Sequence, residues 1–251
     1  MQDVGMDYHT LTDETRALDG ITFTVSEGEF VSIIGPSGCG KSTILSLIAG
    51  LLKPTRGSVE LLGEEVTSPS PQVGYMFQSD HLFPWRNVRR NILLGLEVQK
   101  HLNRETAARV DALIKSYGLE AFSHYNPNHL SGGMRQRAAL IRTLATDPML
   151  LLLDEPFSAL DSQTRLAVSA DMSRIIRGEK KTAVLITHDI AEAIAMADRV
   201  IVLTQRPATI KAQYDIELTC CPSQSPIDRR QSPEFKVYFD KLWKELDVHV
   251  D

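Results

Sequence analysis

The fold of this chain is decided by the stretch Phe30-Val31-Ser32-Ile33-Ile34-Gly35-Pro36-Ser37-Gly38-Cys39-Gly40-Lys41-Ser42-Thr43. Residues 30–34 are a short β-branched run ending at a glycine, which predicts a strand, and Ser42 onward predicts a helix. The glycines between them let backbone amides wrap a phosphate at the positive end of the helix dipole. Lys41 is expected to meet the β- and γ-phosphates, Ser42 to coordinate Mg²⁺, and Thr43 to approach the α- or β-phosphate. The stretch predicts nucleotide binding and leaves open what the nucleotide is used for.

Three continuous apolar runs predict buried strands of a parallel sheet. Two are Met149–Leu153 and Ala183–Ile186, and Val200–Leu203 is a third candidate. Such runs are typical of strands covered on both faces. Polar and apolar residues alternate over Val4–Val25 and Gly57–Leu62, which predicts either an antiparallel sheet beside the nucleotide core or a pair of surface hairpins.

Between the alternating segment that ends at Leu62 and the apolar run that begins at Met149, the pattern becomes helical. Apolar residues recur at three- and four-residue spacing over Val88–Leu96 and Arg104–Tyr117, and Gly118 is placed to end the second helix. An inserted helical lobe over about residues 85–145 is therefore expected.

The C-terminal region predicts one more helix. Ser232 is a suitable N-cap, Pro233 suits the first turn, and Glu234 favours the positive end of the dipole. We expect the apolar stripe of this helix to pack onto its own domain rather than a partner. The stripe consists of Phe235, Phe239, Leu242, Trp243 and Leu246.

Two acidic residues follow a run of leucines. Asp154 and Glu155 come directly after residues 150–153, and Pro156 stands behind them, so a buried strand is expected to deliver them to the nucleotide. Asp154 would hold Mg²⁺ mainly through water, and Glu155 is placed to polarise the attacking water as general base. His188, after the next strand, is expected to donate to the γ-phosphate.

A second candidate anion site lies at Leu130-Ser131-Gly132-Gly133-Met134-Arg135-Gln136-Arg137. Ser131 is predicted to cap a helix from Gly132 to about Ala145, where its hydroxyl, the Gly133 amide and the dipole meet. Because Lys41 lies at a helix start of its own, the chain carries two phosphate-binding ends. A P-loop kinase or GTPase has no use for the second.

Composition narrows the class of protein. The 251 residues are 43% hydrophobic, enough for a sizeable core, and a net charge of -5 leaves no global basic surface, so nucleic acid is not expected as a partner. Three cysteines suggest no disulfide framework, which favours a reducing compartment, and Cys220-Cys221-Pro222 has no interpretation. Without a signal-peptide core or a bilayer-length apolar run, any membrane role is expected to come through a partner.

The order of these motifs resembles the ATPase subunit of an ABC transporter. Phosphate loop, signature Leu130–Gly133, acidic pair and histidine follow one another within residues 4–206 as they do in that family. The resemblance implies an α/β fold: a P-loop NTPase core with a parallel sheet, an antiparallel β subdomain and an inserted helical subdomain. It implies one ATPase domain over residues 1–251, with residues 207–251 as a C-terminal extension, hydrolysing ATP with Mg²⁺.

Several site residues rest on this resemblance. Gln78 resembles the glutamine that contacts magnesium and senses the membrane partner. Tyr8, with His9 as a weaker candidate, resembles the aromatic residue that stacks on adenine. In the family two copies meet head to tail, so the signature Ser131–Gly133 of one subunit caps the ATP of the other, and Asp161 contacts the opposite site.

Finer features resemble one group of importers. They are Phe77-Gln78-Ser79-Asp80-His81-Leu82-Phe83-Pro84-Trp85-Arg86-Asn87-Val88 and Thr204-Gln205-Arg206-Pro207, similar to ATPases of nitrate, sulfonate, taurine, bicarbonate and vitamin-precursor importers. The resemblance implies permease subunits docking near Gln78–Trp85, a location at the cytoplasmic face of the membrane, and an extracytoplasmic solute-binding protein acting indirectly. His129, where glutamine is more usual, and Arg89-Arg90 depart from the pattern.

Alternatives remain open. One is an ABC ATPase acting on nucleic acid or the ribosome, although such proteins usually carry a coiled coil or tandem cassettes. Another is an interaction subunit that uses ATP only as a switch, against which Glu155 and His188 argue. An exporter is a third. The sequence names neither the solute nor the choice between a homodimer and pairing with a paralogue.

Overall fold

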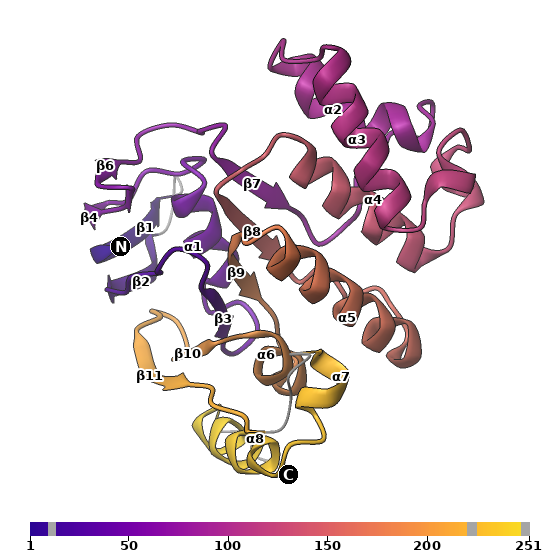
Figure 1. The fold of residues 1–251 in the computed structure, drawn as a ribbon. Coiled ribbons are helices and arrows are strands. Elements are labelled where there is room, and N and C mark those ends of the chain that lie inside the picture. Colours follow the sequence, from indigo (N-terminus) through magenta and orange to yellow (C-terminus); the bar gives the residue numbers. More distant parts are fainter. Residues whose placement is uncertain (10–13, 220–224, 247–251) are drawn as a thin grey trace. The chain divides into compact units, whose positions relative to one another are not determined.

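A computed structural model describes residues 1–9, 14–219 and 225–246 of the chain (Figure 1). The side chain of His9 and the segment Cys220-Cys221-Pro222 lie outside the described residues. The chain divides into two compact units. Unit 1 comprises Met1–Ser70 and Thr182–Asp251, and unit 2 comprises Pro71–Lys181.

Unit 1 contributes neighbouring strands in the order β11-β10-β3-β9, of which β10, β3 and β9 are parallel. Their bounds are Phe30–Ile34 for β3, Thr182–Ile186 for β9, Arg199–Leu203 for β10 and Ile210–Asp215 for β11. The strand predicted over residues 30–34 is present as β3, which pairs in parallel with both β9 and β10, and all five of its residues, Ser32 included, are buried. β11 pairs antiparallel with β10 and was not predicted, because half of its residues are polar and it lies at the sheet edge.

A second sheet of unit 1 is antiparallel, in the order β2-β1-β4, as one of the two interpretations predicted. The strands are β1 (Gln2–His9), β2 (Glu14–Ile21) and β4 (Arg56–Ser58), followed by a hairpin of β5 (Glu60–Leu61) and β6 (Glu64–Glu65).

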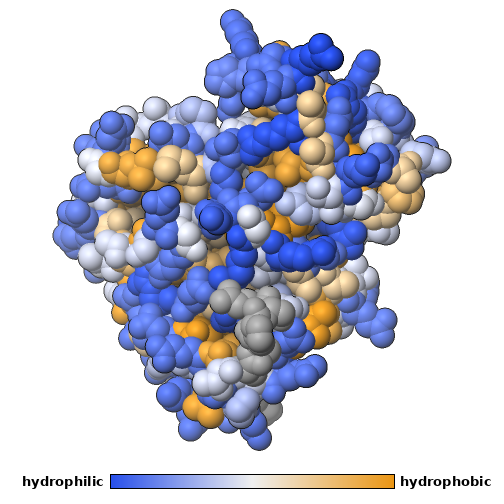
Figure 2. Space-filling view, in the orientation of Figure 1, coloured by the Kyte–Doolittle hydropathy of each residue, from blue (hydrophilic) through white to orange (hydrophobic). Residues whose placement is uncertain are grey.

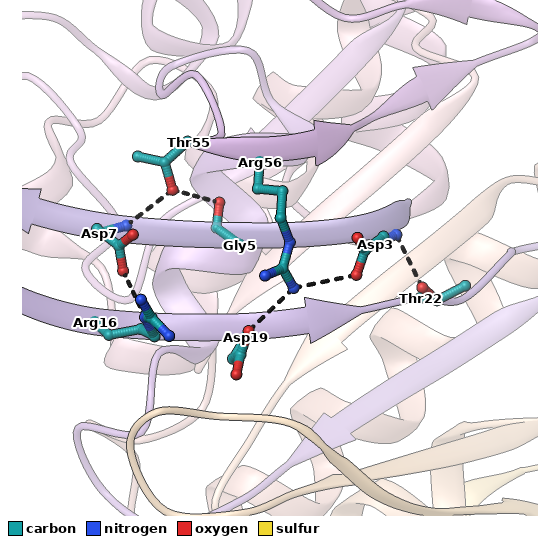
Figure 3. A network of polar contacts seen from close by, with 8 residues as sticks. All are labelled: Asp3, Gly5, Asp7, Arg16, Asp19, Thr22, Thr55 and Arg56. Atoms are coloured by element: carbon teal, nitrogen blue, oxygen red, sulfur yellow. Dashed lines mark hydrogen bonds and ion pairs between the residues drawn. The ribbon is translucent and has the colours of Figure 1, made fainter.

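Polar side chains join the three strands of this antiparallel sheet (Figure 3). Arg56 reaches Asp3 at 3.1 Å and Asp19 at 3.0 Å, while Arg16 pairs with Asp7 at 3.1 Å. Exposed ion pairs of this kind contribute only about 0–1 kcal/mol each. Close packing constrains the sheet more firmly: a Cβ on Gly57, whose φ is +76°, would lie 2.3 Å from the Asp3 carbonyl oxygen.

The helices of unit 1 are α1 (Lys41–Ile48), α6 (Ile190–Met196), α7 (Pro226–Arg229) and α8 (Pro233–Glu245). The predicted C-terminal helix is present as α8, which contacts α6 and buries Leu242 completely, while Trp243 stays 40% exposed. Ser232 occupies the N-cap position but makes no capping hydrogen bond. Its hydroxyl instead donates to Glu234, whose pKa falls to about 2 because Ser232 and Thr219 both donate to the carboxylate.

Unit 2 combines two parallel strands with a helical cluster. Its elements are β7 (Val73–Met76), α2 (Val88–Val98), α3 (Arg104–Ser116), the 3₁₀ turns Glu120–Phe122 and Pro127–His129, α4 (Gly132–Ala145), β8 (Leu150–Asp154) and α5 (Ser162–Gly178). β7 pairs with β8. Val88, Leu113 and Ile141 bring α2, α3 and α4 into one apolar core, and Gly118, with φ +72°, follows α3 where the sequence predicts its end.

The surface of the molecule is largely polar on the face drawn in Figure 2, where apolar side chains form small separate patches. Among the described helices, none has the length and hydropathy needed to cross a bilayer.

Candidate functional site

The phosphate loop of unit 1 joins β3 to α1 and carries its lysine in a fixed position. Lys41 is only 6% exposed, and its Nζ donates to the carbonyl oxygens of Gly35 and Pro36, both at 2.9 Å. Two short bonds to the loop's own backbone place the ammonium charge inside the curve of the loop, where an anion would meet it.

Glycine is required at one point of the loop by both conformation and space. Gly40 has φ +121°, and a Cβ there would lie 2.8 Å from Leu18 Cδ2. A side chain at this position would therefore strain the backbone and collide with β2.

Cys39 of the loop is a packing residue. Its side chain is 2% exposed, and burial raises the pKa of the thiol, although the nearby charge of Lys41 acts in the opposite direction. The thiol is accordingly kept in its neutral, weakly nucleophilic form at physiological pH.

Tyr8 lies beside the end of the phosphate loop. Its hydroxyl and the Thr43 hydroxyl are 3.1 Å apart and share a hydrogen bond, while the side chain is 38% exposed. A half-exposed aromatic ring fastened next to a phosphate loop offers a flat surface for a base. The structure thus brings Tyr8 and Thr43 together.

His188 arrives at the same edge of the sheet as the phosphate loop. β3 and β9 pair Ile33 with Ile186, so Gly35 and His188 each lie two residues beyond paired positions. His188 is exposed, whereas Thr187 before it is buried and its amide donates to the Ile33 carbonyl oxygen at 3.3 Å. The strand end therefore presents the imidazole side chain to solvent.

Unit 2 brings together Gln78 and the acidic pair. In the pairing of β7 with β8, Met76 lies opposite Leu153, so Gln78 and Glu155 each follow two residues after this pair. Gln78 Nε2 donates to Ser158 Oγ at 3.1 Å, and Ser158 Oγ donates to the Glu155 carbonyl oxygen at 3.1 Å. One serine thus connects the glutamine to the backbone of the predicted general base.

Asp154 and Glu155 have distinct surroundings. Asp154 ends β8, and its Oδ2 accepts a hydrogen bond from the Tyr75 hydroxyl at 3.0 Å. Glu155 has φ +43°, an uncommon conformation for a residue with a side chain and one often found at functional sites. Tyr75 was missed by the sequence analysis, since nothing in a single tyrosine on a strand reveals its partner.

The predicted second anion site has the expected local geometry. Ser131 caps α4, and its Oγ accepts from the Met134 amide at 3.3 Å. A Cβ on Gly132 would lie 3.1 Å from Leu160, and one on Gly133 would lie 2.8 Å from Val168 Cγ2. These glycines therefore allow the start of α4 to pack closely against α5 and the chain that leads into it.

Asp161 is found at the start of α5, where it acts as the N-cap. Its Oδ1 accepts from the Gln163 amide at 3.1 Å and the Thr164 amide at 3.0 Å. Hydrogen bonds from Thr164 lower the pKa of this exposed carboxyl group, so it remains ionised at neutral pH.

Two arginines of α4 hold the segment after Gln78. Arg135 Nε donates to Asp80 Oδ2 at 3.0 Å, and Arg142 donates to the carbonyl oxygens of Asp80 and His81, each at 2.7 Å. The helix that begins with the signature therefore also fixes the residues that follow Gln78.

Comparison with known proteins shows which proteins share this sequence and fold. The family model described as "ABC transporter" matches residues 18–158. The ABC transporter ATP-binding protein YtlC of Bacillus subtilis is 46% identical over 240 residues, covering 96% of this chain and 92% of that protein. The aliphatic sulfonates import ATP-binding protein SsuB of Bacillus licheniformis is 40% identical, covering 94% and 89%. The dimeric ATP-binding cassette MJ0796 bound to ADP and Pi superposes with a TM-score of 0.73 at 31% identity, covering 86% of this chain and 97% of the other.

Proposed function

Because this chain belongs to the ABC transporter family, we propose that it is the ATP-hydrolysing subunit of a membrane importer. The single observation that carries the proposal is the phosphate loop of unit 1, whose Lys41 is held inward by the Gly35 and Pro36 carbonyl oxygens. In unit 2, β8 ends at Asp154, directly before Glu155, and supports it. We propose that residues 1–251 act as one ATPase domain, with about 85–145 as its helical subdomain and 207–251 as an extension.

ATP is held, in this proposal, by the loop Gly35–Thr43 and by Tyr8. The loop amides and Lys41 bind the phosphates, and the Tyr8 ring stacks on adenine. Support comes from the inward Lys41 ammonium and from the hydrogen bond between Tyr8 and Thr43.

Hydrolysis requires a base, a positioned water and compensation of charge. Glu155 polarises the attacking water, Gln78 orients it, and His188 donates to the γ-phosphate. Ser42, Gln78 and Asp154 offer hydroxyl, amide and carboxylate oxygens, a donor set that suits Mg²⁺. The ion supplies charge compensation for the phosphates when bound.

Two copies are proposed to act together, as a head-to-tail homodimer. Ser131, Gly132, Gly133 and Asp161 of one copy then complete the ATP site of the other. The relative MJ0796, a dimeric cassette with ADP and Pi, supports this arrangement. Its support within this chain is the capped start of α4, whose hydroxyl, amide and dipole suit a phosphate.

Importer coupling is the finest part of the proposal. Permease subunits would dock near Gln78–Trp85, which places the protein at the cytoplasmic face of the membrane, and a solute-binding protein would deliver the solute outside. The proposed solute is small, of the nitrate, sulfonate, taurine, bicarbonate or vitamin-precursor type, and SsuB, named for aliphatic sulfonates import, supports the sulfonate member of this range. The segment is suited to contact, since Trp85 is 74% exposed and stacks on Phe83 with ring centroids 4.9 Å apart.

Glu155→Gln tests the chemistry. The amide keeps the shape and removes the base, so phosphate release should fall by about 10²- to 10⁴-fold while ATP binding persists and the closed dimer accumulates. Glu120→Gln, an exposed glutamate of the same unit, is the matched control and should leave turnover unchanged. An undiminished rate in Glu155→Gln would remove Glu155 from its role.

Mass spectrometry of proteins that co-purify from solubilised membranes tests the proposed permease partner. Recovery of ribosomal or DNA-repair proteins instead would reject the importer assignment.

A further inference from the structure

One motif has no part in the proposed chemistry, the turn Thr204-Gln205-Arg206-Pro207 between β10 and β11. Arg206 from this turn reaches the phosphate loop: its Nη2 donates to the Gly38 carbonyl oxygen at 2.8 Å and its Nε to the same oxygen at 3.3 Å. The guanidinium therefore grips one peptide group of the loop with two hydrogen bonds.

The turn that carries Arg206 is itself firmly held. The Thr204 amide donates to the Thr209 carbonyl oxygen at 3.0 Å, and the Thr209 amide donates back to Thr204 Oγ1 at 2.9 Å. Ala208 then joins β2, because its amide donates to Ala17 at 2.9 Å and its carbonyl accepts from Asp19 at 2.9 Å. Arg206 thus extends from a rigid base.

β2 also meets the other side of the phosphate loop. Gly40 packs so closely on Leu18 that no Cβ would fit, and Leu18 forms a bridge with Ala208. The turn 204–209 and β2 are therefore hydrogen-bonded to each other, and together they contact the phosphate loop at Gly38 and at Gly40.

The phosphate loop is rich in glycine, so contacts from neighbouring segments are needed to keep it in one conformation. Gly38 and Gly40 have φ +71° and +121°, and glycine loses more conformational freedom on ordering than any other residue. The Gly38–Cys39 peptide is planar, so directing its carbonyl oxygen toward Arg206 turns the Cys39 N–H the opposite way, toward Pro36 O at 3.3 Å. If the loop spends only a fraction of its time in the competent form, the apparent affinity for the nucleotide falls to that fraction of its intrinsic value.

We propose that Arg206 is a positioning residue of the phosphate loop, which holds the Gly38 peptide so that the loop is already shaped for the β-phosphate of a nucleotide. The proposal rests on the proposed ATP site and adds to it a residue from outside the loop. Arg206 acts through Gly38 and is not assigned a contact with the nucleotide.

Competition against a fluorescent ATP analogue tests this, with ADP and AMP as the probes. Arg206→Gln should weaken ADP binding about tenfold, equivalent to about 1.4 kcal/mol, and leave AMP, which lacks a β-phosphate, almost unchanged. KM for ATP should rise by a similar factor with kcat retained. Arg206→Lys keeps the charge but cannot make both bonds, so it should recover little of the loss.

Arg174→Gln is the matched control, because it removes one exposed positive charge from unit 2 and should alter neither constant. Full recovery by Arg206→Lys would show that charge alone matters and overturn the positioning role, as would equal losses for ADP and AMP or no loss at all. If Arg206→Gln melts far below the wild type, Arg206→Lys decides alone: wild-type ADP affinity in that variant rejects the proposal. A wild-type protein that neither binds nor hydrolyses ATP would instead reject the proposed function.

Discussion

Asn91 of α2 should be one of the costliest polar side chains to remove. It is fully buried, and its Oδ1 accepts from the Phe83 amide at 2.7 Å. Its Nδ2 shares its two hydrogens among the carbonyl oxygens of Phe83, Arg86 and Asn87, which lie 3.0–3.1 Å away. One side chain therefore holds the turn that precedes α2.

The cost of Asn91→Ala follows from which groups lose their partner. Phe83 O keeps the Arg86 amide at 3.1 Å, and Asn87 O keeps the residue 91 amide at 2.9 Å. The Phe83 N–H and the Arg86 carbonyl oxygen lose the bonds that Asn91 makes. At about 1–3 kcal/mol for each group, and with the turn only partly buried, we expect a loss of about 2–4 kcal/mol.

Urea unfolding followed by circular dichroism measures this loss. Asn103→Ala provides the control, since Asn103 also accepts from two backbone amides, at 2.9 and 3.0 Å, but at the exposed start of α3. Loss of such a cap typically costs about 1 kcal/mol. If Asn91→Ala costs no more than Asn103→Ala, the reasoning from burial and orphaned groups is refuted.

Asn91→Asp distinguishes hydrogen bonding from packing. The carboxylate preserves the volume and can still accept from the Phe83 amide, but it places negative charge against three carbonyl oxygens. We expect at least as large a loss as for alanine at neutral pH, with partial recovery as the pH falls. Wild-type stability at neutral pH would show that volume alone matters.

Two further predictions concern unit 2. Gly133→Ala should cost about 1–3 kcal/mol, because the added Cβ would lie 2.8 Å from Val168 Cγ2 and 3.2 Å from Thr164 Cγ2; thermal unfolding measures it, and an unchanged midpoint would contradict close packing there. Burial, together with the hydrogen-bonded carboxylate of Glu179, raises the pKa of Tyr117 to about 12. The unfolded phenol ionises near its ordinary value of 10.0, so stability should be fully present below that pH and decline as pH rises through the folded pKa. Tyr117→Phe should flatten this part of the profile, and an identical decline in the variant would assign it to other groups.

Local sequence signals were sufficient where one segment determines its own structure. Residues Phe30–Ile34 are apolar except for Ser32 and form the fully buried β3, and Ser131 caps α4 where the sequence predicts. Both results follow from short-range rules: burial on two faces for the strand, and a side-chain oxygen for the free amides of a helix start.

The same rules were insufficient where a second partner competes for a side chain, or where the pairing strand lies elsewhere in the chain. Ser232 satisfies every local requirement of a capping serine, yet its hydroxyl donates to Glu234, which Thr219 also contacts. β11 alternates apolar and polar residues, but six such residues also suit a loop, and pairing with the edge of β10 is what makes them a strand. The first outcome is a local competition that a capping preference does not weigh, and the second depends on long-range pairing that local propensity does not contain.

Asn91 and Arg206 show the same limit at functional segments and give it a physical reason. A loop lacks the regular backbone pairing of a helix or strand, so its carbonyl oxygens and amides need partners from side chains. Asn91 supplies them to the turn beside Trp85, and Arg206 supplies them to Gly38. Neither residue lies in a motif that announces this role, because the requirement arises from the loop and the partner from a separate segment. It follows that substitutions of Asn91 or Arg206 should impair any activity that depends on the loop each one supports, although the motif residues themselves are unchanged.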